Sequence, residues 1–208
     1  MTPAITRAIA TTVRDTIDAG LVAGIGQPVP GQMCVEAAVC YALGLPHGDD
    51  PGCVAPTLRA LKITLNDADW SSPQARAKGL RRLAVAQLGS AGVLDDAEFA
   101  RRVLDMTIRR VVPAALRSAV SVNTASAAAL ESAAVRCEQE GTREACRHAE
   151  TVAARAASTA RAARAARAAR AARDQSLSTY AEWVVEILIG MNAPGCQWLD
   201  LVPVEVMP

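Results

Sequence analysis

The sequence predicts an all-α protein with a compact helical core, a long Ala-rich helical hairpin arm and a short extended C-terminal tail. Of the 208 residues 51% are hydrophobic but only 3% are aromatic, so the core must be built from Ala, Leu, Val and Ile. Alanine is the strongest helix former and lets helices approach closely. Apolar residues recur at helical spacing along the chain, and no β-sheet pattern is visible.

The N-terminal segment predicts one amphipathic helix followed by an unusual loop. The helix spans residues 2–19, with Thr2 as N-cap and Gly20 as its end. Its apolar stripe consists of Ile5, Ile9, Val13 and Ile17. The loop over residues 20–33 carries four glycines and two prolines.

Two short helices follow this loop. The first is predicted over residues 34–43, because Gly44 and Pro46 then end it. The second is predicted over residues 55–66, with an inward face formed by Leu58, Leu61 and Leu65.

The segment Trp70-Ser71-Ser72-Pro73 predicts a new helix start, because a serine cap followed by proline in the first turn is a typical N-terminus. This amphipathic helix should reach about Leu88. Asp95 or its neighbour should cap the next helix, which we expect Pro113 to kink or end. Its buried side should carry Phe99, Val103, Met106 and Ile108.

The pattern changes to Ala-rich helix over residues 123–189. The length favours two antiparallel helices that turn near residues 138–142. The segment includes a three-residue repeat, Arg-Ala-Ala, that begins at Arg161 and ends at Arg173. Because three residues advance only about 300° around a helix, these arginines wind around it and leave no clean apolar face.

These elements predict three parts of the chain. Residues 1–120 form the helical core, residues 121–180 the Ala-rich arm, and residues 181–208 the end of the last helix and the tail. The tail is apolar without helical periodicity over residues 194–203. We expect it to lie extended on the core or on another subunit of a homo-oligomer.

Composition limits the function classes. The net charge of +1 gives no overall attraction to nucleic acid or membranes, and no apolar run reaches the roughly 18 residues that a membrane span needs. With no export signal at Met1, we expect a soluble, cytoplasmic protein. The six cysteines lack Cys-x2-Cys spacing, so we expect free thiols, no metal and no cofactor. The acidic loop residues, which could otherwise hold a divalent cation, are expected to be solvated: Asp49, Asp50, Asp67 and Asp69.

The favoured hypothesis is non-enzymatic binding of a small anionic, nucleotide-like molecule. A Gly/Pro loop that leads into a helix N-terminus presents N–H groups to an anion, and a second such N-terminus follows at Ser71 or Ser72. Trp70 could stack on a base, and basic residues follow on the same helix. The predicted ligand-binding residues are Gln27, Gln32, Met33, Cys34, His47, Asp49, Trp70, Ser71, Ser72 and Arg76.

The first alternative is a cysteine-dependent enzyme. Cys34 lies where a helix begins, and the dipole of a helix N-terminus lowers the pKa of a thiol. Gln32 could supply an oxyanion donor and His47 a base. This arrangement resembles papain-like and transglutaminase-like enzymes, but those families take their histidine from a later β-strand, which this sequence does not predict.

The second alternative is a nucleic-acid-binding or structural role for the arm, through Arg161, Arg164, Arg167, Arg170 and Arg173. Regularly spaced guanidinium groups can neutralise phosphates. The repeat contains no aromatic residue, however, and repeats of this kind also arise by codon-repeat expansion. A nucleic-acid partner is therefore less favoured than an arm of variable length under weak constraint.

Several blocks resemble a group of bacteriophage and prophage proteins for which no activity is established. They are the block Gly31-Gln32-Met33-Cys34-Val35-Glu36-Ala37-Ala38-Val39-Cys40 that continues to Asp49, the segments at 70–72 and 78–84, and the ending at 193–199. The group also carries an Ala-rich three-residue repeat of varying length. The resemblance implies a phage accessory protein in a bacterial host, such as one that inhibits a host factor or sequesters a nucleotide signal of antiviral defence. It supplies no catalytic residues.

Overall fold

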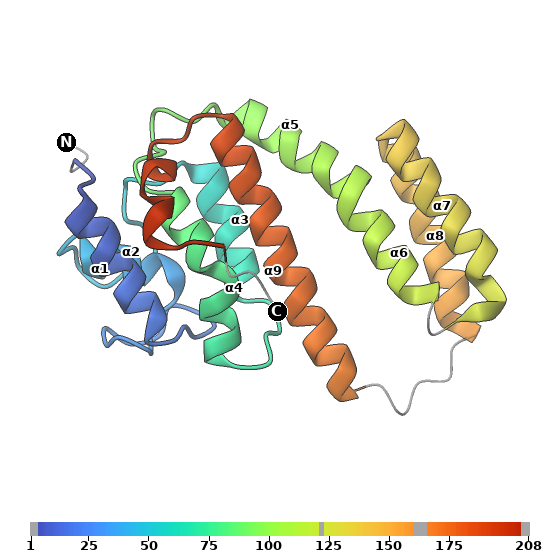
Figure 1. Cartoon of the computed structure of the whole chain (residues 1–208), viewed down its shortest axis with the longest axis horizontal. Helices are drawn as coiled ribbons and strands as arrows, with labels where there is room; N and C mark the ends of the chain where they lie inside the picture. The colour runs from blue at the N-terminus through green and yellow to red at the C-terminus, as the bar shows by residue number, and fades with distance from the viewer. Residues whose placement is uncertain (1–3, 121–122, 160–165, 205–208) are drawn as a thin grey trace. The chain divides into compact units, whose positions relative to one another are not determined.

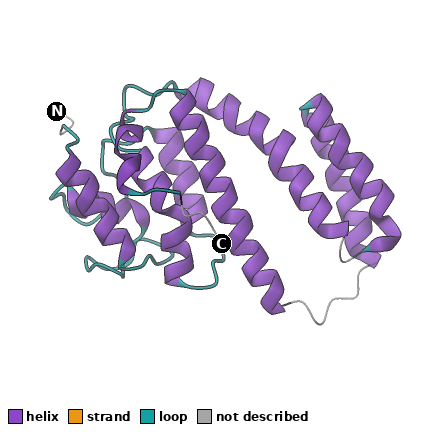
Figure 2. Cartoon of the chain, in the orientation of Figure 1, coloured by secondary structure: helices purple, strands orange, loops and turns teal. Residues whose placement is uncertain are grey.

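The computed structural model describes residues 4–120, 123–159 and 166–204 (Figure 1). The regular structure within these residues is helical, and no β-sheet forms among them (Figure 2). The predicted all-α fold is therefore confirmed. No helix of the described residues is both long enough and apolar enough to cross a membrane.

The chain divides into two units. The first comprises Met1–Phe99 and Arg167–Pro208, and the second comprises Ala100–Ala166. Residues 100–120, which the sequence analysis assigned to the core, belong here to the unit that holds the Ala-rich segment. The reason is packing, because the apolar side of α6 (Val112–Val120) is buried against α7 (Ala127–Glu140).

In the first unit, α1 (Arg7–Asp18) packs against α2 (Val35–Ala42) and α4 (Pro73–Ala86). The hydroxyl of Thr6 caps α1 by accepting a hydrogen bond from the Ile9 N–H at 3.3 Å. The predicted start of this helix at residue 2 was wrong, because residues 4–6 are not helical; the predicted cap, Thr2, lies outside the described residues. Helix α1 buries Ala10, Val13, Thr16 and Ile17, so much of the predicted stripe forms core.

The predicted starts of the later helices are confirmed. Helix α3 (Pro56–Asn66) has proline in its first turn. The Ser72 hydroxyl caps α4 by accepting a hydrogen bond from the Ala75 N–H at 3.0 Å. Asp95 caps α5 (Asp96–Met106) in the same way, through two backbone N–H groups at 3.0 Å. Capping is local chemistry, which is why sequence alone could locate these starts.

The C-terminal segment forms a 3-10 helix, η3 (Pro194–Leu201), rather than the predicted extended tail. It packs against α4 and α1. A Cβ atom at Gly195 would lie 2.4 Å from the carbonyl oxygen of Val85 and 2.6 Å from that of Ala86. Only glycine therefore permits η3 to sit this close to the end of α4.

The second unit begins with the continuation of α5 into a π-helical turn, η1 (Thr107–Val111), and then into α6. Pro113, expected to kink or end the helix, lies in the first turn of α6, and the chain stays helical there. The wide π turn just before it leaves room for the proline ring and changes the hydrogen-bonding pattern where the proline N–H is missing.

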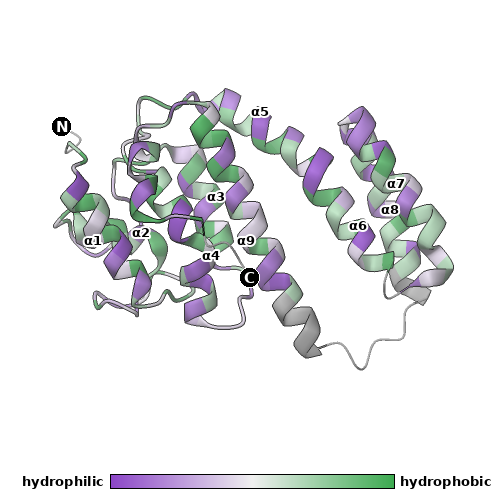
Figure 3. Cartoon of the chain, in the orientation of Figure 1, coloured by the Kyte–Doolittle hydropathy of each residue, from purple (hydrophilic) through white to green (hydrophobic). Residues whose placement is uncertain are grey.

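Helices α7 and α8 (Arg143–Thr159) form an antiparallel hairpin whose turn lies where the sequence predicted it (Figure 1). The predicted extent of the arm, residues 121–180, was wrong, because residues 166–190 form a separate helix that packs with the first unit. Gly141 makes the turn in the left-handed conformation, with φ of 63°. The Arg109 guanidinium donates to the carbonyl oxygens of Glu138, at 2.5 Å, and Gln139, at 3.1 Å. The helices of this unit carry hydrophobic and hydrophilic residues in alternation along their length (Figure 3), and their apolar sides form its core.

The last helix, α9 (Ala166–Gly190), is part of the first unit. Of the repeat arginines, Arg161 and Arg164 lie outside the described residues, while Arg167 and Arg170 lie in α9. Arg173 is exposed and forms an ion pair with Asp69. This last repeat arginine is thus held by a carboxylate of its own unit.

Candidate ligand-binding site

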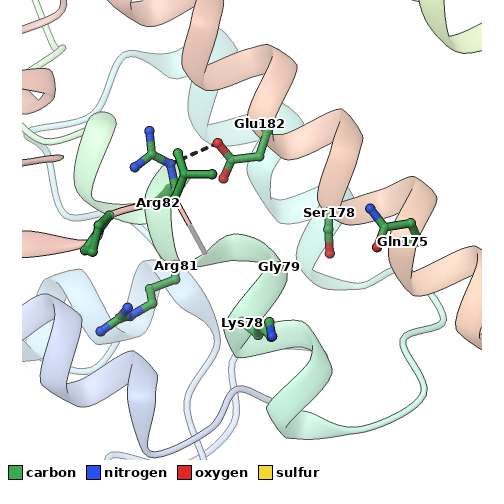
Figure 4. A pocket seen from close by; sticks show the side chains of 9 residues that line it. Lys78, Gly79, Arg81, Arg82, Gln175, Ser178 and Glu182 are labelled. Atoms are coloured by element: carbon green, nitrogen blue, oxygen red, sulfur yellow. Dashed lines mark hydrogen bonds and ion pairs between the residues drawn. The ribbon is translucent and has the colours of Figure 1, made fainter. Parts of the chain in front are cut away.

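A pocket of about 150 Å³ lies in the first unit, between α4, α9 and the segment after η3. Figure 4 shows the side chains around it, with the α4 residues on one wall and the α9 residues on the other. We call it the α4–α9 pocket. Its lining consists of Lys78, Gly79, Arg81, Arg82, Gln175, Ser178, Glu182, Pro203 and Val204.

Gly79 sets the distance between the two walls. A Cβ atom at this position would lie 2.3 Å from the Trp70 ring and 2.6 Å from the Ser178 hydroxyl. The bare backbone of α4 therefore approaches α9 closely at this point. Lys78 and Arg82 lie on the same helix as Gly79, and both line the pocket.

Three basic side chains and one carboxylate line the pocket, and two of the basic side chains pair with carboxylates of the same unit. The Arg82 Nε atom lies 2.9 Å from the Glu182 carboxylate, and its Nη1 atom donates to the Val202 carbonyl at 2.6 Å. Arg81 makes a two-point contact with Asp18 of α1, at 2.6 and 2.8 Å. Both guanidinium groups are therefore held in place by their own unit.

The predicted anion site at the start of α4 is filled by the protein itself. The backbone N–H of Ser71 donates to the Asp174 carboxylate at 2.9 Å, and the Ser71 hydroxyl donates to the same group. The Ser72 hydroxyl is used in capping. An internal carboxylate thus takes the place that the hypothesis reserved for a ligand phosphate.

Trp70 and Arg76 are structural residues here, and the roles predicted for them need correction. Trp70 is only 6% exposed, and its indole N–H donates to the Leu65 carbonyl at 2.8 Å. Arg76 is 8% exposed and donates to the backbone carbonyls of Asn66, at 2.7 Å, and Leu21, at 2.9 Å. Burial lowers the pKa of Arg76. Tertiary packing has enclosed both side chains, so neither offers a ligand an open surface.

The predicted binding loop folds back on itself. The Gln27 N–H donates to the Gln32 carbonyl at 2.7 Å, and Gly26 forms an isolated β-bridge with Met33. Met33 is buried, whereas the side chains of Gln27 and Gln32 are exposed. The His47 Nε2 atom lies 3.1 Å from the Gly26 carbonyl oxygen. His47 therefore tethers this loop.

Of the predicted ligand-binding residues, Cys34 and Asp49 do line a common cavity, of about 70 Å³. Glu36, Asn66 and Asp67 also line it. The charged residues of this lining are all acidic, which disfavours the small anion that the hypothesis placed here. The other predicted residues do not line this cavity.

The Cys34 thiol has a raised pKa, opposite to the lowered one predicted from its position at a helix start. The residue is 5% exposed, and this burial is the main cause of the raised pKa. The sulfur does cap α2, where it accepts a hydrogen bond from the Ala37 N–H at 3.3 Å. Desolvation therefore outweighs the helix terminus at this site.

A buried ion pair that sequence analysis missed lies in the core of the first unit. The Lys62 Nζ atom is 3.0 Å from the Glu36 carboxylate, and both side chains are 0% exposed. The Gln87 amide approaches the same carboxylate at 3.5 Å. Burial raises the pKa of Glu36 and lowers that of Lys62. The spacing from Leu58 to Lys62 on α3 was the available signal, because it puts the lysine on the buried face.

The α9 wall of the α4–α9 pocket was also missed. Gln175, Ser178 and Glu182 follow the Ala-rich repeat, where the sequence shows no motif. Only the fold brings them to Lys78 and Arg82.

Among the described residues, no group of three or more His, Cys, Asp or Glu side chains is placed to hold a metal ion. The chain matches no protein-family model, no curated protein and no solved structure.

Proposed function

We propose that this protein binds a small anionic molecule in the α4–α9 pocket. The observation that supports the proposal is that cationic side chains line one side of the pocket and neutral hydrogen-bond donors line the other. Helix α4 contributes the cationic side chains of Lys78 and Arg82, and α9 contributes the hydroxyl of Ser178 and the amide of Gln175. Cations and neutral donors that face one cavity suit the oxygens of a phosphate or carboxylate.

Glu182 affects how much negative charge a ligand needs in order to bind Arg82. Its carboxylate already pairs with Arg82, so a bound anion would share that guanidinium or replace Glu182 there. A doubly charged group competes better with a carboxylate than a singly charged one does, because its Coulomb attraction is larger at equal distance. This favours a phosphate ester over a simple carboxylate.

The size of the pocket favours a small ligand or the charged end of a larger one. A volume of about 150 Å³ accommodates roughly ten to fifteen water-sized groups, taking about 10–15 Å³ for each. A phosphate with part of a ribose fits within that space. The nucleotide-like ligand expected from the sequence therefore remains our proposal, with its base held outside the pocket and not on Trp70.

The first experiment identifies the ligand. The purified full chain is exposed to nucleotides, cyclic nucleotides and inorganic phosphate, and the unbound excess is removed. The protein is then heated, and the released molecules are identified by mass spectrometry. Retention of an intact nucleotide that also raises the melting temperature supports the proposal. Release of a chemically altered nucleotide would show an enzyme instead, and a blank for all compounds, including inorganic phosphate, contradicts small-anion binding.

Variants then locate the site. Lys78→Gln and Ser178→Ala should each weaken binding of the retained compound about tenfold, because each removes one hydrogen bond or charge contact worth about 1.4 kcal/mol. Arg14→Gln is the control, since Arg14 is a cation of α1 outside the pocket and pairs with Asp15. Unchanged affinity in both pocket variants, measured by calorimetry, would place the ligand elsewhere.

A further inference from the structure

The second unit carries an apolar groove of about 220 Å³ between α6 and α8. Each helix lines it with positions spaced by three, four and seven residues, which form one face of a helix. The residues that define the groove include Val112, Leu116 and Ala119 on α6, and Cys146, Ala149 and Ala153 on α8. An open groove of this form fits another helix laid along it.

The charged side chains beside the groove differ from those near α7 in whether they form ion pairs. On the α7 side, Arg117 pairs with Glu131 and Glu138, and Arg136 pairs with Glu140. On α8, Glu150 lines the groove and is exposed, and Arg147 is exposed one turn earlier. Within the described part of the chain, the structure gives neither of these two side chains an ion-pair partner. Their charges are thus available to a partner.

The positions of Arg147 and Glu150 are self-complementary. When two identical helices pack antiparallel about a twofold axis, each residue faces the residue equally far from the axis in the other direction. The residue numbers of every facing pair therefore have the same sum. With the axis between residues 148 and 149, Glu150 of each copy faces Arg147 of the other. This arrangement creates two opposite-charge contacts beside the apolar groove, which Glu150 itself lines.

We propose that the α6–α8 groove is the interface of a homodimer, in which α8 packs antiparallel to α8 of a second copy. The apolar lining supplies the area removed from water, and the reciprocal contacts between Glu150 and Arg147 set the register. A second copy satisfies both charges with the residues that this chain already presents. This proposal is independent of the ligand-binding function.

A charge swap in the full chain tests the interface. Sedimentation equilibrium should show a dimer for the unmodified protein. Glu150→Arg and Arg147→Glu should each weaken dimerisation at least tenfold, because each places two pairs of like charges in contact. An equimolar mixture of the two variants should dimerise again, since every contact is then between opposite charges. Chain misfolding could not produce this recovery.

Ser132→Arg is the matched control, because Ser132 is exposed on α7 and does not line the groove. It should leave the dimer unchanged. Ala115→Glu, which places a charge in the groove itself, should give a monomer. A monomeric unmodified protein up to near-millimolar concentration would overturn the proposal. So would a dimer that survives both charge reversals, or variants that do not recover on mixing.

Discussion

Replacing Lys62 with methionine tests whether the buried ion pair governs the stability of the first unit. Within the described residues, Lys62 forms one ion pair, the 3.0 Å contact with Glu36, and neither side chain is exposed. Methionine keeps most of the side-chain volume but leaves the carboxylate without a counter-charge. Removal of one partner of a buried pair typically costs about 3–5 kcal/mol, so we expect Lys62→Met to lose that much stability at neutral pH.

The loss should depend on pH in a defined direction. Burial already raises the pKa of Glu36 in the folded protein, and removal of Lys62 raises it further. The folded variant therefore binds a proton more tightly than the unfolded chain does. Its stability should be greatest below the ordinary glutamate pKa of about 4.3 and should fall as the pH rises through the folded-state pKa of Glu36.

Tryptophan fluorescence during urea unfolding is the assay. All three tryptophans of the chain, Trp70, Trp183 and Trp198, belong to the first unit, so their signal reports that unit alone. The double variant Lys62→Met/Glu36→Leu should recover most of the stability, because an apolar pair of similar volume is often at least as stable as a buried ion pair. A loss below about 1 kcal/mol that is the same at pH 5 and pH 8 would refute this reasoning.

Three further outcomes follow from the packing. Gly79→Ala should destabilise the first unit by about 1–3 kcal/mol, because its new methyl group meets the Trp70 ring; an unchanged urea midpoint would contradict this. Asp174→Ala should cost about 1 kcal/mol by leaving the Ser71 N–H without its acceptor, whereas Asp174→Asn should recover part of the loss. Iodoacetamide should modify Cys34 only as the unit unfolds, and peptide mapping that finds it modified rapidly in the native protein at pH 7.5 would contradict its burial.

Features fixed by local chemistry could be predicted from the sequence. The helix start at Ser72 and Pro73, the cap at Asp95 and the turn at Gly141 each depend on a few neighbouring residues. The all-α class follows in the same way from composition and periodicity, and it is confirmed.

Features fixed by distant contacts could not be predicted. Trp70 has the sequence context of a loop residue, yet it is buried with its ring against Gly79 of α4. The pocket needs Ser178 beside Lys78, and no local pattern links two residues so far apart in the chain. The predicted lowering of the Cys34 pKa was wrong for the same reason. The position of Cys34 at a helix start can be read from local sequence, but its desolvation depends on the whole fold.

The discontinuity of the first unit has a consequence for how the protein is made. The α4 wall of the pocket precedes the whole second unit in the chain, and the α9 wall follows it. During synthesis the second unit is complete before the ribosome has made the remainder of the first. A message cut short within the Ala-rich repeat would therefore yield chains that hold an intact α7–α8 hairpin but only the α4 wall of the α4–α9 pocket.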